Sequence, residues 1–320
     1  MSMSILQLAD KLCTEADAYL LLENMRWHGR PLCPHCGSVG EHYFLTPANG
    51  KSRKTRTGAA SERRVWKCRD CRKQFSVLTG TIFHGTKIPI RVWLLVIFDA
   101  STAKNGISAR EIERKYGVTP RTAWHLMHRL REAMKIEPIA GLLTGRVVAD
   151  ESWIGGQPKN RHATHPRAFG TPGRKTEKTT IFTLVSRETG EARSRIIPNV
   201  KGSTLRKAMS EQLDPARTHL HTDGWHGYRH FTAQHSTVDH GIGEYARGDV
   251  STNQAEGYFS QLKRSIDGTH HHVSREHLHR YLAEFDYRYT TCKMTDAERM
   301  DTLIGKVVGR RLTYRSPTHR

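Results

Sequence analysis

Two C-x-x-C pairs, Cys33 with Cys36 and Cys68 with Cys71, place the tightest constraint on how this chain can fold. Four thiolates in two such pairs suit a closed tetrahedral zinc site, which leaves no open position for catalysis. We therefore expect structural Zn²⁺ to hold a small ribbon together. Binding of this kind is worth on the order of 10 to 16 kcal/mol in small modules.

The excess of basic over acidic residues limits the kinds of partner that this protein can bind. The chain has 51 lysines and arginines against 31 aspartates and glutamates, a formal net charge of +20 at pH 7. This excess indicates a polyanionic partner, and favours nucleic acid over a membrane surface. We find no apolar run of about 18 residues and no signal peptide, so we expect a cytoplasmic protein. A disulfide framework is disfavoured in that reducing compartment.

Shifts in composition divide the 320 residues into five segments. We expect N-terminal helices over 1–28, a zinc ribbon with a basic insert over 29–86, a helix-turn-helix DNA-binding region over 87–138, the catalytic domain over 144–290, and a basic tail over 291–320. The basic insert is expected as a hairpin tip or loop, and the tail as a partly ordered segment. The insert either contacts phosphate or is simply solvated. The tail either contacts DNA or a second protomer, or is a charged, solvated tail, and these interpretations stay open.

A helix-turn-helix pattern follows the ribbon. Ser108 can cap one helix with Glu111 completing a capping box, Gly117 can end that helix, and Thr119–Pro120 can begin the next. Three polar residues fall at the exposed start of the second helix: Arg121, Thr122 and His125. These positions would make base or phosphate contacts. A plain helical hairpin is the alternative, and the net charge favours DNA binding.

Acidic residues in the largest segment fall at expected strand ends. Asp150 follows an apolar run, and Asp223 ends another run just before a Gly/Trp turn. A helix that begins near Thr252 carries Glu256, with Lys263 two turns later on one face. Two carboxylates on strand ends and a third on a helix form a set that can hold two divalent cations.

The order of elements in this segment predicts the fold class. The Asp150 strand is followed by a hairpin of strands at 179–185 and 192–198, a helix at about 202–213, and the strand 218–222 that leads to Asp223. Three strands in a meander, then a helix, a strand and a later helix, is the order of a ribonuclease-H-like fold. We expect an α/β domain with a mixed sheet and flanking helices.

These motifs together resemble a known family. The cysteine pairs, Thr79–His84, Ala149–Gly156, His221–Asp223 and Thr252–Arg264 are similar to those of bacterial insertion-sequence transposases that join an N-terminal zinc ribbon to a DDE domain. The resemblance covers nearly the whole chain, from about residue 25 to residue 290. No single motif is decisive, and their order carries the resemblance.

The resemblance implies a bacterial, nucleoid-associated transposase that binds the double-stranded ends of its element and target DNA. It implies DNA strand cleavage followed by strand transfer of the freed 3′-hydroxyl. Asp150, Asp223 and Glu256 would hold two Mg²⁺ ions, or Mn²⁺ in their place. The family also implies assembly on two DNA ends, as a homodimer or a larger complex.

Alternatives remain for the third ligand and for the function. Asn253 lies one helical turn before Glu256 and competes with it, whereas Glu151 should point to the other side of its strand. Lys263 and Arg264 are expected to contact DNA phosphate. A zinc-ribbon and helix-turn-helix regulator would need no acids. A ribonuclease-H-like nuclease would use the same acids without strand transfer.

Overall fold

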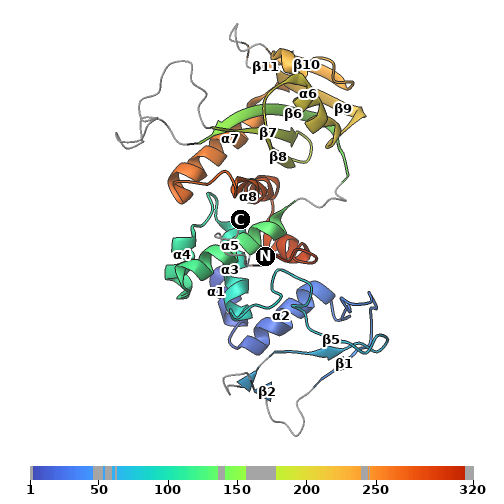
Figure 1. Cartoon of the computed structure of the whole chain (residues 1–320), viewed down its shortest axis with the longest axis vertical. Helices are drawn as coiled ribbons and strands as arrows, with labels where there is room; N and C mark the ends of the chain where they lie inside the picture. Colours follow the sequence, from blue (N-terminus) through green and yellow to red (C-terminus); the bar gives the residue numbers. More distant parts are fainter. Residues whose placement is uncertain are drawn as a thin grey trace. The chain divides into compact units, whose positions relative to one another are not determined.

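The computed structural model describes residues 3–45, 53–54, 60–61, 63–135, 141–155, 178–238, 244 and 246–313 (Figure 1). The chain divides into two compact units. The first contains Met1–Met134 together with Met294–Arg320, and the second contains Lys135–Lys293. The chain therefore leaves the first unit, builds the second, and then returns to the first.

The first unit combines helices with short antiparallel ribbons. Its helices are α1 (Ile5–Lys11), α2 (Glu15–Trp27), α3 (Ile90–Thr102), α4 (Ala109–Tyr116), α5 (Pro120–Met134) and α9 (Asp296–Gly305). One sheet has the order β1-β4-β5, formed by β1 (Tyr43–Phe44), β4 (Trp66–Lys67) and β5 (Gln74–Phe75). Within the basic insert, β2 (Arg53–Lys54) pairs antiparallel with β3 (Ala60–Ser61), and most of the rest of the insert lies outside the described residues.

Side-chain caps explain where the helices of this unit begin. Ser4, Thr14 and Thr295 each form a full capping box with the residue three positions later, at the start of α1, α2 and α9. Ser108 caps α4 by accepting from Glu111 N, as predicted, but the Glu111 carboxylate pairs with Lys115 Nζ at 3.0 Å instead of completing the predicted capping box. Gly117 ends that helix in the left-handed region with φ of 64°. The predicted pair of helices, α4 and α5, therefore forms in the structure.

The C-terminal segment differs from the partly ordered basic tail that we expected. It forms α9, which packs against α3 and buries Met300, Leu303 and Ile304. After α9 the backbone of Ile82 donates to Val307 O at 3.1 Å, so the segment also joins the end of the ribbon. The apolar residues recur at helical spacing, and this signal was hidden by the basic residues around them. Residues 314–320 lie outside the described part.

The second unit is built on a five-stranded sheet with the order β10-β9-β6-β7-β8. The strands are β6 (Leu143–Ile154), β7 (Thr179–Ser186), β8 (Ala192–Ile197), β9 (Leu213–Asp223) and β10 (Gln234–Val238). β6, β7 and β8 form an antiparallel meander, whereas β9 is parallel to β6 and β10 is parallel to β9. This mixed sheet confirms the predicted ribonuclease-H-like fold. The edge strand β10 was not predicted.

Helices cover both faces of this sheet (Figure 1). The helical elements are α6 (Gly202–Ser210), the short η3 (His226–Tyr228), α7 (Asn253–Ser265), the π-helical η5 (Ile266–His270) and α8 (Leu278–Thr290). A small hairpin of β11 (Ala246–Arg247) and β12 (Val250–Ser251) precedes α7. One core joins α6 to one face of the sheet, and a second core joins α7 and α8 to the other. We call these the α6 face and the α7 face.

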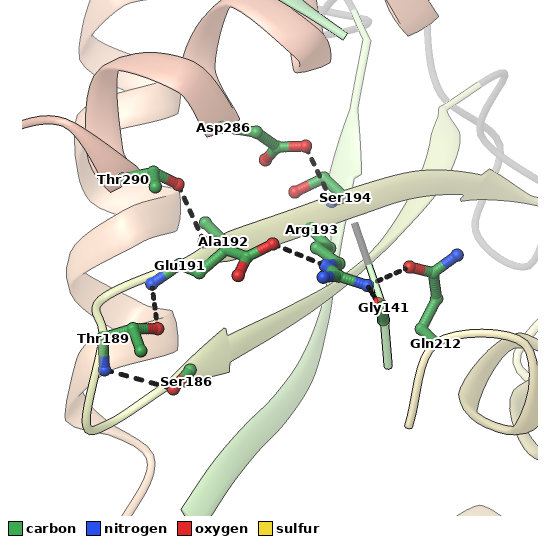
Figure 2. A network of polar contacts seen from close by, with 10 residues as sticks. All are labelled: Gly141, Ser186, Thr189, Glu191, Ala192, Arg193, Ser194, Gln212, Asp286 and Thr290. Atoms are coloured by element: carbon green, nitrogen blue, oxygen red, sulfur yellow. Dashed lines mark hydrogen bonds and ion pairs between the residues drawn. The ribbon is translucent and has the colours of Figure 1, made fainter. Parts of the chain in front are cut away.

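The edge strand β8 is covered by α8. Ala192 N donates to Thr290 Oγ1 at 3.1 Å, and Ser194 N donates to Asp286 Oδ2 at 2.8 Å (Figure 2). Between them Arg193 contacts Glu191 Oε1 at 2.8 Å and turns towards the other side of the strand. Side chains of α8 thus take up N–H groups that would otherwise be open to pairing with another chain.

Replacing Leu303 by alanine should lower the free energy of unfolding of the first unit by about 2 to 5 kcal/mol. The side chain of Leu303 is fully buried in α9, so truncation leaves a cavity. Scanning calorimetry on the full chain should show the transition of the first unit shifted and that of the second unchanged. Val308→Ala is the matched control because Val308 is 51% exposed. Equal losses in both variants would contradict the packing of α9.

Candidate active site and zinc centre

The four cysteine Sγ atoms form a compact cluster, all within 4.8 Å of one another. Cys33 Sγ lies 3.7 Å from Cys71 Sγ, and Cys36 Sγ lies 3.6 Å from Cys68 Sγ. Sulfur atoms about 2.3 Å from a zinc ion at the corners of a tetrahedron are about 3.8 Å apart. The cluster therefore has the dimensions of the closed zinc site that the sequence predicts.

A tight backbone turn closes after each cysteine pair. Gly37 follows the first pair with φ of 75°, and Arg72 follows the second with φ of 61°, so both turns close through a left-handed residue. Burial acts to raise the pKa of the Cys68 thiol, whereas the backbone N–H groups of Cys71 and Asp70 and the thiols of Cys36 and Cys71 together lower this pKa to about 6. The N–H groups of the turn thus help to stabilise a thiolate at Cys68, the form that binds zinc.

The ribbon is fastened to α2 through Glu23. The buried carboxylate of Glu23 accepts from Arg64 Nε at 2.9 Å and from Trp66 Nε1 at 2.9 Å. Trp27, at the end of α2, packs edge-on against Trp66 and Phe75, with ring centroids 6.2 and 5.9 Å away. Because a buried charge is tolerated only when it is paired, loss of the ribbon would also destabilise α2.

The predicted DNA-contacting residues lie in the first turns of α5. Arg121 is exposed, whereas Thr122 and His125 are half-buried. Thr119 Oγ1 accepts from Thr122 N at 3.3 Å, which satisfies one free N–H group at the start of the helix. The side chain of Arg121 is therefore the most accessible of the three.

Strand register places Asp150 and Asp223 on one face of the sheet. In the parallel pair of β6 and β9, Val148 lies opposite His221. Asp150 and Asp223 each follow that pair by two residues, so both point to the same side as Val148 and His221. This side is the α7 face, because the neighbouring Val147 belongs to the core of the α6 face. Both aspartates are half-buried.

Only one of the two aspartates ends its strand. Asp223 is the last residue of β9, as predicted, and its Oδ1 accepts from Trp225 N at 3.1 Å. Asp150 lies inside β6, which continues to Ile154 because β7 pairs with it as far as that residue. The pairing of β6 with β9 ends at Val148, opposite His221. Asp150 thus lies where β6 separates from β9.

Glu151 lies on the opposite face from Asp150, as its position in the strand predicts. Burial raises the pKa of Glu151 to about 7, and the charges of Asp150 and Asp223 act in the same direction. The buried Tyr228 lies close enough to interact with it, and Tyr228 belongs to the core of the α6 face. Glu151 is therefore a buried carboxyl group behind the two aspartates.

Glu256 lies in the first turn of α7 and is exposed, as is Asn253 at the start of the same helix. Lys263 and Arg264 are exposed in its last turn, and Arg264 Nη2 donates to Ser260 Oγ at 2.9 Å. Across the described ranges, the four cysteines alone form a group of three or more potential ligands this close together. The structure therefore does not gather Glu256 with the two aspartates at that distance.

His221 entered the sequence analysis only as part of a family motif, and no role was predicted for it. It lies on the α7 face with Asp223, is 1% exposed, and shows no hydrogen-bond partner for either ring nitrogen within the described residues. The ring of His219 lies 4.6 Å away. Burial, and then the charges of His219 and Arg187, lower the pKa of His221 to about 4. His219, His221 and Asp223 are spaced two residues apart, and this spacing in a strand could have predicted from the sequence that they share one face of the sheet.

Comparison with known proteins assigns a family to both units. Residues 142–290 match the family described as the ISXO2-like transposase domain. Residues 13–74 match the family described as the transposase zinc-ribbon domain. The chain belongs to the ISXO2-like DDE transposases. The match to the transposase domain covers the whole five-stranded sheet together with α6, α7 and α8.

A curated relative supports the same assignment over nearly the full length. It is described as an uncharacterized protein in transposable element ISH50 of Halobacterium salinarum. The two chains are 26% identical over 303 residues, which cover 91% of this chain and 96% of the relative. This relative is archaeal, so the similarity extends beyond the bacterial proteins that the sequence motifs suggested. Among the described residues, no helix is long and apolar enough to cross a membrane.

Removal of zinc should destabilise the first unit and leave the second unchanged. Cys68→Ser removes one ligand of the cluster, so the protein should be isolated with less than one zinc per chain and a lower melting temperature for the first unit. Cys13→Ser is the control, because Cys13 lies outside the cluster. Metal content and calorimetry on both variants test this. A Cys68→Ser protein with full zinc content would contradict the four-cysteine site.

Acid should destabilise the second unit through His221. The pKa of His221 is about 4 in the folded chain and 6.5 in its ordinary state, so unfolding takes up a proton between these values. The free energy of unfolding should therefore fall as the pH drops through this range, by at most about 1.4 kcal/mol per pH unit. Urea unfolding of wild type and His221→Gln at about pH 7.5 and about pH 5 measures this. Equal losses on acidification would contradict a buried neutral histidine.

Proposed function

We propose that this chain binds the ends of its mobile element, cleaves DNA strands there, and joins the freed 3′-hydroxyl to target DNA. The observation that carries this proposal is the register of β6 and β9, which directs Asp150 and Asp223 to one face of the transposase domain. Two half-buried carboxylates that point to the same face of neighbouring parallel strands suit the binding of hard divalent cations.

The donor set fits Mg²⁺, and Mn²⁺ in its place. Asp150 and Asp223 would supply the carboxylate oxygens, and Glu256 would supply the third from α7. Asn253 is the alternative third ligand, since it is exposed one turn earlier on the same helix. When bound, a pair of such ions stabilises the attacking and leaving oxygens of an in-line displacement at phosphorus. Water is the nucleophile for cleavage and the 3′-hydroxyl for strand transfer.

Basic residues on the same helix would position the DNA. Lys263 and Arg264 are exposed in the last turn of α7 and would contact backbone phosphate. The contact of Arg264 with Ser260 keeps its guanidinium near the helix surface. Each phosphate contact of this kind makes the slope of the logarithm of DNA affinity against the logarithm of salt concentration more negative by about one.

The first unit would recognise the element ends. The zinc ribbon and the start of α5 both expose basic or polar groups, with Arg121 the most accessible on α5. Thr122 and His125 would add contacts once DNA is bound, where the second helix of a helix-turn-helix enters the major groove. We further propose that the working form is a homodimer or a larger assembly on two DNA ends. Its place in the cell would be the DNA-containing cytoplasm.

Loss of any acid of the triad should abolish strand transfer. Asp150→Asn, Asp223→Asn and Glu256→Gln should each lower the rate by at least about a hundredfold, because each removes charge that stabilises the transition state. The assay is joining of a labelled DNA end, taken from the sequence that flanks the gene, to a plasmid in Mg²⁺. Asn253→Ala should retain activity if Glu256 is the third ligand.

The same assay separates the two alternative functions. Strand cleavage that depends on the acids but gives no joined product would favour a nuclease without strand transfer. Binding of the ends that is unaffected by the acids, with no cleavage at all, would favour a DNA-binding regulator. Binding should be measured on the same variants by gel shift, so that a loss of joining is not mistaken for a loss of binding.

A further inference from the structure

A row of polar side chains crosses the sheet beside Asp150. Thr183 in β7 lies directly opposite Asp150 on one side and Ser194 in β8 on the other. Residues directly opposed in antiparallel strands point to the same face, so the three side chains share the α7 face. Thr183 is completely buried. A polar row, fully buried at Thr183, therefore runs from the proposed metal ligand to the edge of the sheet.

Hydrogen bonds continue this row into two helices. The hydroxyls of Thr183 and Ser194 lie 2.8 Å apart, and Ser194 Oγ donates to Tyr258 Oη at 2.8 Å. Tyr258 Oη in turn donates to Asp286 Oδ1 at 2.8 Å, and the other oxygen of Asp286 accepts from Ser194 N (Figure 2). The network thus joins β7 and β8 to α7 through Tyr258 and to α8 through Asp286.

The members of this network are shielded from water. Tyr258 is 1% exposed and Asp286 is 3% exposed. Burial of a carboxylate and a phenol in this core costs free energy unless their hydrogen bonds are made. An apolar contact would hold α7 on the sheet equally well but would let it rotate or slide. A hydrogen bond is directional and fixes the helix in one orientation.

Tyr258 lies on the same helix as Glu256. Tyr258 belongs to the buried face of α7, whereas Glu256 is exposed and follows the buried Ala255 directly, so it projects from the flank of the helix. Fixing Tyr258 Oη therefore fixes the direction in which Glu256 projects. A second tie comes from α8, where Tyr289 Oη donates to Gln254 O at 3.2 Å in the first turn of α7.

We infer that Tyr258 and Asp286 are positioning residues, which set the direction of the Glu256 carboxylate relative to Asp150. This inference rests on the proposed function, since it takes Glu256 as a metal ligand. It assigns a role to two buried residues that touch neither DNA nor the reacting atoms. The polar row supports this role, because Asp150 and Ser194, which contacts both Tyr258 and Asp286, lie opposite Thr183 on its two sides.

Binding of Mn²⁺ to the purified chain, followed by electron paramagnetic resonance, tests the inference without DNA. Tyr258→Phe removes one hydroxyl with little change in shape, and Asp286→Asn replaces one of the two accepting carboxylate oxygens by an amide group that cannot accept. Each should weaken Mn²⁺ binding by about threefold to tenfold, the effect of one hydrogen bond of about 1 kcal/mol. Thr291→Val is the matched control, because it removes a buried hydrogen bond of α8, to Tyr287 O, that lies outside the network.

A double-mutant cycle shows whether the effect passes through Glu256. In a Glu256→Gln background, Tyr258→Phe should cause no further loss of Mn²⁺ affinity, since the carboxylate that it positions is gone. An equal loss in both backgrounds would overturn the inference and leave only a general structural role. An unchanged affinity in Tyr258→Phe, with the wild-type melting temperature, would overturn it as well.

Two further measurements separate this inference from the proposed function. If Asp150→Asn and Glu256→Gln bind Mn²⁺ as the wild type does, the metal site of the proposed function fails, and a role in aligning Glu256 fails with it. Hydrogen exchange tests the anchor itself. Amides of α7 should exchange about threefold to tenfold faster in Tyr258→Phe, while those of β6 and β9 stay unchanged. Unchanged exchange in α7 would overturn the anchor even if the acids bind metal.

Discussion

The parallel pairing of β6 with β9 is the constraint on which the candidate active site depends. Parallel neighbours keep their side chains in step, so the pair Val148 and His221 sets the side to which both aspartates point. A shift of one residue would turn one aspartate into the α6 face, where Glu151 already lies. The meander of β7 and β8 holds β6 from the other side, so the register is fixed by both neighbours.

The α7 face shows how one surface can serve packing and chemistry together. Its apolar core holds α7 and α8 on the sheet, whereas the polar row through Thr183 and Ser194 gives this contact a direction. Asp286 has two structural roles: it accepts from Ser194 N at the edge of β8, and it accepts from Tyr258 Oη. The same carboxylate therefore protects the sheet from pairing with another chain and orients the helix that carries Glu256.

The first unit gains its stability from joining separate parts of the chain. Zinc ligation gathers two cysteine pairs, and Glu23 ties the resulting ribbon to α2. The return of the chain as α9 closes the unit, since Leu303 packs in its core and Val307 joins the end of the ribbon. A small ribbon has too little apolar area to be stable alone, and metal and neighbouring helices supply the rest.

The sequence by itself determined the four clustered cysteines, the start and end of α4 and the ribonuclease-H-like order of elements, because short spacings and local caps carry those signals. It also indicated Asp150 and Asp223, although it placed Asp150 at a strand end. Only the tertiary structure decided the register of β6 and β9, the burial of His221, and the link from Tyr258 to Asp286. These features depend on contacts between residues far apart in the chain. Local sequence patterns do not specify which distant strand or helix will pack against a given segment.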